Sequence, residues 1–178
     1  MANRKPTAAE RTFLLLFHAT VSGGFLVAYL TGDEDTYGMH VFSGYAVLAA
    51  LALRAVAGVV VAEGSPLRFP KPAVRPALDW LARLLSGDAK ARTERSPLIA
   101  WMAVALLAGV GLTAVSGALA DFVVKLEDLH EALGEAALWI AAVHVGLIFW
   151  LHWLKRPRPA TVPRWPSRRP DLSNRVSP

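Results

Sequence analysis

Four apolar stretches dominate the pattern of hydrophobic and polar positions along the chain. They run over residues 12–30, 39–62, 97–120 and 129–154, and each is about 19 to 26 residues long. Because a helix rises 1.5 Å per residue, roughly 20 residues cross a hydrocarbon core ~30 Å thick. Inside lipid a span must be helical, since its backbone polar groups have no water to bond. The pattern therefore predicts an all-α integral membrane four-helix bundle.

The polar segments complete this organisation. A loop over residues 63–96 joins the second and third spans, and residues 76–86 within it form an amphipathic pattern. We expect that short helix to lie flat on the membrane surface, with Trp80 at the interface. Beyond the last span, residues 155–178 are rich in Arg, Pro and Ser. The sequence thus predicts one four-span domain over residues 1–154 and a disordered basic tail over 155–178.

Charge sets the expected orientation. The net charge is +5, and segments 1–11, 63–96 and 152–178 hold 17 of the 19 Lys and Arg residues. Loops 31–38 and 121–128 hold Lys125 and six acidic residues. The positive-inside rule therefore places both termini of this multi-pass protein in the cytoplasm, and its expected location is an inner membrane. The basic segments suit anionic membrane lipid, and they lack the aromatic-interleaved groove expected of a nucleic-acid site.

All five histidines lie in or at the edges of the apolar stretches. Ionisable residues inside a membrane are costly and mark functional sites. His40 and His130 are each the second residue of their spans, near the acidic side. His18 and His144 lie ~9 Å and ~12 Å from the cytoplasmic ends of theirs. The fifth, His152, falls at the cytoplasmic boundary, where an interfacial position is expected. The other four therefore form two pairs at two depths.

Helical rotation supports the same pairing. His130 and His144 are 14 residues apart, which is nearly four turns, so they share one face of span four with a rise of ~21 Å between them. Haem requires an axial ligand on each face of a flat, mostly apolar disc. The chain has no cysteine, which excludes thiolate ligands, iron–sulfur clusters and covalent attachment. We therefore predict two b haems, one between His18 and His144 on the cytoplasmic side and one between His40 and His130 on the periplasmic side.

Small residues beside the ligands would leave clearance for the macrocycle. Ser22, Gly44 and Gly134 each lie four positions after a predicted ligand, which places them next to it on the helix face. Arg54 lies 14 residues after His40, level with the cytoplasmic pair. It is predicted to bind a propionate of that haem, and the alternative is that it reaches the cytoplasmic headgroups.

Other interpretations of these residues are weaker. A single membrane histidine is often a helix–helix hydrogen bonder, and zinc would want three or four ligands at one point. Each of the two depths here offers only two histidine ligands. Span three carries no ionisable side chain but has Gly109, Thr113, Ser116 and Gly117. Such small residues permit close helix approach in lipid, so its predicted role is to close the bundle.

The histidine pattern resembles that of the bacterial cytochrome b561 family, in the branch with cytochrome b subunits of nickel–iron hydrogenases. The resemblance covers residues 10–156, is most specific in span four, and rests on His18 and on segments 40–44, 54–58, 68–69, 113–117, 129–133 and 142–145. It implies the same ligand pairs. It also implies transmembrane electron transfer between ubiquinone or menaquinone and a periplasmic redox protein such as a c-type cytochrome.

Two other functions stay open. Some members of the wider family oxidise superoxide and reduce ubiquinone, but the acidic periplasmic loops would repel superoxide and better suit a basic protein partner. The other alternative is a non-redox membrane anchor subunit, although an anchor has no need of level-matched histidines. A bundle this small is also compatible with a homodimer.

Overall fold

The computed structural model describes residues 5–155, and this part of the chain is helical with no strand. Its elements are α1 (Ala8–Leu30), α2 (Tyr37–Val60), α3 (Val74–Leu85), α4 (Ala89–Thr93), α5 (Leu98–Ala120), the 3-10 helix η1 (Val124–Leu126) and α6 (Glu127–Leu154). The helices α1, α2, α5 and α6 are long and apolar enough to cross a membrane. The all-α, four-span prediction is confirmed to that extent. Of the predicted tail over 155–178, all but Lys155 lies outside the described residues.

The outer surface of the long helices is strongly apolar. Leu16, Leu53 and Phe149 are all largely exposed, and many other large apolar side chains are exposed as well. A water-soluble fold rarely leaves so large a continuous apolar surface uncovered, whereas lipid chains would cover it at no penalty. Burial therefore agrees with length and composition in indicating membrane-spanning helices.

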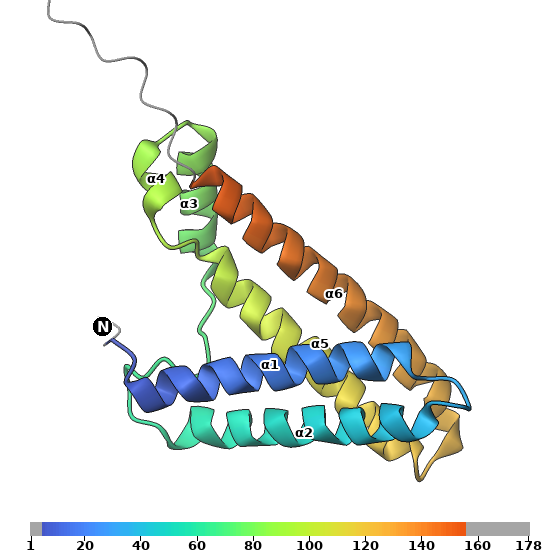
Figure 1. Cartoon of the computed structure of the whole chain (residues 1–178). Coiled ribbons are helices and arrows are strands. Elements are labelled where there is room, and N and C mark those ends of the chain that lie inside the picture. Colours follow the sequence, from blue (N-terminus) through green and yellow to red (C-terminus); the bar gives the residue numbers. More distant parts are fainter. Residues whose placement is uncertain (1–4, 156–178) are drawn as a thin grey trace, which may run out of the picture.

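The long helices form two antiparallel hairpins (Figure 1). In the first, α1 packs along α2, and in the second, α5 packs along α6. Gly24 allows the first close approach, because a Cβ there would lie 2.7 Å from Val47 Cγ2. Gly109 does the same in the second, where a Cβ would lie 3.0 Å from Ile140 Cδ1. This confirms close packing by a small residue of span three.

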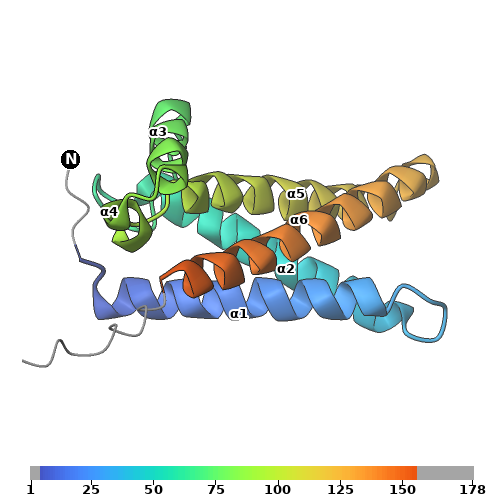
Figure 2. The ribbon, with the colours of Figure 1, turned by 90° about the horizontal axis from the view of Figure 1, so that it is seen from above.

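The two hairpins meet along α2 and α5. Their contact is a small apolar cluster of Val47, Val110 and Ala137. Both hairpin turns lie at the same end of the molecule, whereas α3 and α4 lie at the other (Figures 1 and 2). We call these the acidic end, which carries residues 31–36 and 121–126, and the basic end. The hairpins diverge toward the basic end (Figure 1).

The amphipathic helix is present, and Trp80 on it is buried in protein. Trp80 is 2% exposed and packs with Leu84 and Ala91 against Leu151 of α6. Its indole Nε1 donates a hydrogen bond of 2.9 Å to the carbonyl oxygen of Ala91. The tryptophan is therefore a core residue of a small cap over the basic end of α6, because the following α4 supplies an acceptor that periodicity alone does not reveal.

Polar contacts also tie the start of α1 to the segment that follows α2. Thr7 and Glu10 form a reciprocal capping box that begins α1. The Glu10 Oε1 atom also accepts a hydrogen bond of 2.5 Å from the hydroxyl of Ser65. The basic end of the first hairpin is thereby closed by side chains as well as by packing.

Candidate functional site

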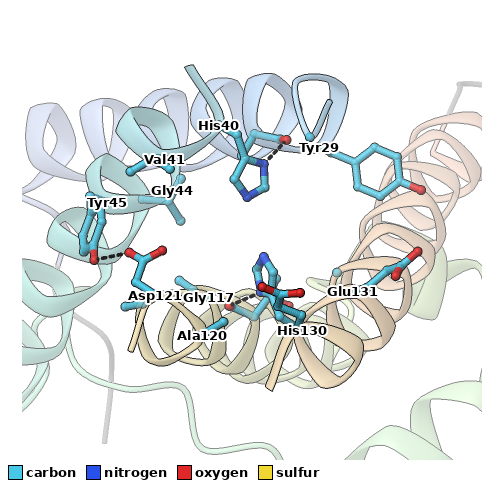
Figure 3. A pocket seen from close by; sticks show the side chains of 18 of the residues that line it. Tyr29, His40, Val41, Gly44, Tyr45, Gly117, Ala120, Asp121, His130 and Glu131 are labelled. Atoms are coloured by element: carbon cyan, nitrogen blue, oxygen red, sulfur yellow. Dashed lines mark hydrogen bonds between the residues drawn. The ribbon is translucent and has the colours of Figure 1, made fainter. Parts of the chain in front are cut away.

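The structure brings two of the predicted ligands together at the acidic end. The imidazole of His40 on α2 faces that of His130 on α6 across the space between the hairpins (Figure 3). Their ring centroids are 5.9 Å apart, and the ring planes are 80° to one another. An imidazole–metal bond is roughly 2 Å long, so two imidazoles on opposite sides of one iron have centroids roughly 6 Å apart. The observed spacing therefore fits a shared metal centre.

Hydrogen bonds set the protonation of both rings. The Nδ1 atom of His40 lies 2.7 Å from the carbonyl oxygen of Ala28 on α1. The Nδ1 atom of His130 lies 3.1 Å from the carbonyl oxygen of Thr113 on α5. A carbonyl oxygen only accepts, so in each ring Nδ1 carries the proton and donates. In the neutral ring the other nitrogen, Nε2, carries the lone pair, and this tautomer is the one that binds a metal through Nε2.

A cavity surrounds the two rings. Its volume is about 840 Å³, and it lies between the acidic ends of the hairpins. This is within the usual range of cofactor sites. Gly44 and Gly134 both line it. A Cβ at Gly44 would have no heavy atom within 4 Å, and one at Gly134 would meet only Thr113 Cγ2, at 3.8 Å. Both glycines thus border open space next to a ligand, where the sequence predicted clearance.

Helix α5 positions His130, a role that the sequence reasoning missed. A Cβ at Gly117 would lie 2.7 Å from His130 Cε1, so the ring packs directly on this glycine. Ser116 donates a hydrogen bond to the Thr113 carbonyl at 2.9 Å, and its oxygen lies 3.3 Å from His130 Nδ1. Span three therefore does more than close the bundle, because it supplies the surface against which the ligand ring is held.

The rim of the cavity is acidic and aromatic. Among its lining side chains the acids are Asp121, Glu127, Glu131 and Glu135, and within residues 5–155 no lysine or arginine lines it. Tyr45 donates a hydrogen bond of 2.7 Å to Asp121 Oδ2 at one side of the cavity (Figure 3). A cationic partner would be attracted to this rim, and a small anion would be repelled.

The second predicted pair is less organised. His18 is exposed, and its Nδ1 lies 3.2 Å from the hydroxyl of Ser22. Ser22 therefore lies beside its ligand as expected, but as a hydrogen-bond partner. His144 is half-buried, and its Nδ1 is buried without a hydrogen-bond partner. Within residues 5–155 no ring contact joins His18 to His144, although the two imidazoles are close enough to interact electrostatically.

Arg54 is engaged elsewhere than predicted. It is 5% exposed, and its Nη1 donates a hydrogen bond of 2.5 Å to the carbonyl oxygen of Leu67. Its guanidinium lies over the ring of Phe69, with Cζ 5.5 Å from the ring centroid. The structure thus shows Arg54 holding the segment after α2, and a contact to a propionate stays a prediction. His152, expected outside the ligand set, is exposed near the end of α6.

Comparisons of this chain with protein-family models, with curated proteins and with solved structures gave no match.

Proposed function

We propose that the chain is a transmembrane electron-transfer cytochrome b of the kind that the sequence pattern resembles. One b haem would be held between His40 and His130, and a second between His18 and His144. When bound, haem iron supplies a reversible one-electron carrier. The protein's part is to supply the axial nitrogens, to orient them, and to surround each site with apolar helix.

The observation that carries the proposal is the geometry of His40 and His130. The two rings come from different hairpins, face one another at a metal-sharing distance, and both hold their proton on the nitrogen that points away from the other ring. Each ring also makes a helix–helix hydrogen bond, His40 to Ala28 on α1 and His130 to Thr113 on α5. Such bonds alone do not require two rings from separate hairpins to face one another across a cavity, whereas a shared metal does.

The second haem is supported by sequence spacing and by the unpartnered Nδ1 of His144. Four helical turns separate His144 from His130 on α6, so two haems would be stacked along the membrane normal. Electrons would then pass between the two faces of the membrane. We propose a quinone at one end and a basic periplasmic redox protein at the acidic rim.

The test is the amount of haem bound to the purified, detergent-solubilised chain, measured by the pyridine haemochrome assay. We expect about two b haems per chain, since each needs one pair of axial histidines. Alanine substitution of either member of a pair should remove one haem, and His152→Ala is the matched control that should remove none. A chain from haem-replete cells that contains no haem would refute the proposal and favour the membrane-anchor alternative.

The same preparation tests the rival activity. Superoxide is an anion, and the acidic rim should slow its approach. Rapid reduction of the bound haem by superoxide, compared with reduction by a basic c-type cytochrome, would reverse the ranking of these two functions.

A further inference from the structure

One hydrogen bond links the two hairpins. The hydroxyl of Tyr45 on α2 donates to Asp121 Oδ2 at the end of α5, with 2.7 Å between the oxygens. Within residues 5–155 no other hydrogen bond or ion pair joins the first hairpin to the second. Their other contacts are the apolar cluster of Val47, Val110 and Ala137 and the facing rings of His40 and His130. The Tyr45–Asp121 bond is therefore the one hydrogen bond between the hairpins in this part of the chain.

The bond lies at the cavity that holds the ligand pair. Tyr45 and Asp121 both line it, together with His40 and His130. Figure 3 shows the bonded pair at one side of the cavity while the two imidazoles face one another beside it. Tyr45 is five residues after His40 on α2, and Asp121 is four residues after Gly117, the glycine beneath His130. Each partner is thus fixed to the same helix as a ligand or its support.

Local helix energetics do not explain Asp121. It is the residue at the C-terminal cap of α5, where its backbone N–H bonds to the Gly117 carbonyl. A carboxylate there faces the negative end of the helix dipole, which is unfavourable. Departures from local preference of this kind usually mark a functional requirement. The hydrogen bond that Asp121 accepts from the Tyr45 hydroxyl accounts for an aspartate at this position.

We infer that Tyr45 and Asp121 form a latch between the hairpins, which holds His40 and His130 at ligand spacing and slows loss of the cofactor from this site. The effect on cofactor loss rests on the proposed function, whereas the effect on the distance between His40 and His130 does not. The ligands come from separate hairpins, so the cofactor can leave when the acidic ends separate. A phenol-to-carboxylate bond resists that separation in one defined geometry.

Hairpin spacing is measured first, on haem-free protein. The chain has no cysteine, so spin labels attached at Asp35→Cys and Lys125→Cys report the distance between the two hairpin turns without background. We expect Tyr45→Phe and Asp121→Ala to lengthen or broaden the distance distribution. Asp121→Asn should keep the distance distribution of the parent, because the amide oxygen can still accept the hydrogen bond from the Tyr45 hydroxyl. Asp128→Ala removes a neighbouring charge outside the cavity lining and should leave the distribution unchanged. A Tyr45→Phe distribution identical to that of the parent overturns the latch.

Haem release into excess apomyoglobin is measured second. For the haem that depends on His130, both single variants should release it roughly three- to tenfold faster, the factor expected from one exposed hydrogen bond. The double variant should be no faster than either single variant, because both remove the same bond. Additive acceleration, or no acceleration, overturns the latch while the proposed function stands. A parent chain without haem refutes the proposed function, and the label distances still decide the latch.

Discussion

The contact between Gly117 and the ligand ring allows a sharp test of the acidic-end site. In Gly117→Ala, the new Cβ would lie 2.7 Å from His130 Cε1 and 3.1 Å from its Nδ1. Carbon atoms in contact are normally ~3.5–4.0 Å apart, so the ring must move by roughly 1 Å. A functional group has to hold its position to within roughly 0.5 Å. The added methyl group should therefore remove His130 from its place in the ligand pair.

The expected loss is large and confined to one site. Disturbing the support of a metal ligand typically lowers affinity by about 10- to 100-fold. Purified Gly117→Ala should thus bind about one haem per chain in place of about two, since only one axial pair is disturbed. Retention of the other haem shows that the bundle has folded.

Gly111→Ala is the matched control on the same helix. A Cβ at Gly111 would have no heavy atom within 4 Å, and alanine favours a helix over glycine by up to ~1 kcal/mol. This variant should keep the full haem content. The reasoning is refuted if Gly117→Ala binds as much haem as Gly111→Ala with an unchanged absorption spectrum. Loss of both haems from Gly117→Ala alone would show that the glycine supports the whole bundle and not this ligand.

Three further outcomes follow from the geometry. The ring planes of the acidic-end pair are 80° apart, so the ferric haem there should give the low-spin electron paramagnetic resonance signal of perpendicular imidazoles, with one very large g value. If both haems gave the rhombic signal that is typical of parallel axial imidazoles, this geometry would be contradicted. The Thr113 hydroxyl bonds to the Leu133 carbonyl of α6 at 2.9 Å. Thr113→Val should therefore lower bundle stability by ~0.6–1.7 kcal/mol in a detergent unfolding titration, and an unchanged midpoint would argue against a net contribution. The hydrogen bond from Arg83, 2.8 Å long, lowers the pKa of Glu94. Because the pKa of Glu94 is lower in the folded state, the ionised carboxylate stabilises the cap at pH values above the unfolded-state pKa, and this stabilisation is lost as the pH falls through the folded-state pKa. Amide exchange in α3, corrected for intrinsic rates, should therefore rise in that pH range in the parent and not in Glu94→Gln.

The long helices could be predicted from the sequence because membrane thickness fixes their length. Predicted spans and observed helices differ by at most a few residues at each end, as with 12–30 against Ala8–Leu30. The facing of His40 and His130 was also predictable, since depth in the span and a 14-residue spacing depend only on helix geometry. Gly44 and Gly134 follow from the same argument, because a neighbour four positions away shares the ligand's face.

Contacts between helices could not be predicted in this way. Periodicity identifies an apolar face but not what covers it, and the sequence did not show that Trp80 packs against Ala91 of α4 and Leu151 of α6. The same limit hid Gly117, because its role depends on which face of α5 meets α6. The four-residue spacing of Thr113 and Gly117 could have indicated this role, because it places the Thr113 carbonyl and the space beside Gly117 on the same face of the helix. The partner of Arg54 is the Leu67 carbonyl, which lies in a loop whose path the sequence does not specify.

The proposed ligands are divided between the two hairpins, which would explain how so open a bundle holds together. His18 and His40 belong to the first hairpin, whereas His130 and His144 belong to the second. Each proposed haem would therefore bridge the two hairpins. Within residues 5–155 these otherwise share one small apolar cluster, one hydrogen bond and the contact between the His40 and His130 rings. The free energy of haem binding would then also stabilise the association of the two hairpins, as in proteins whose metal sites form only on folding. On this view α5, which carries no ligand, is as necessary as the helices that do, because it fixes one ligand before the cofactor arrives.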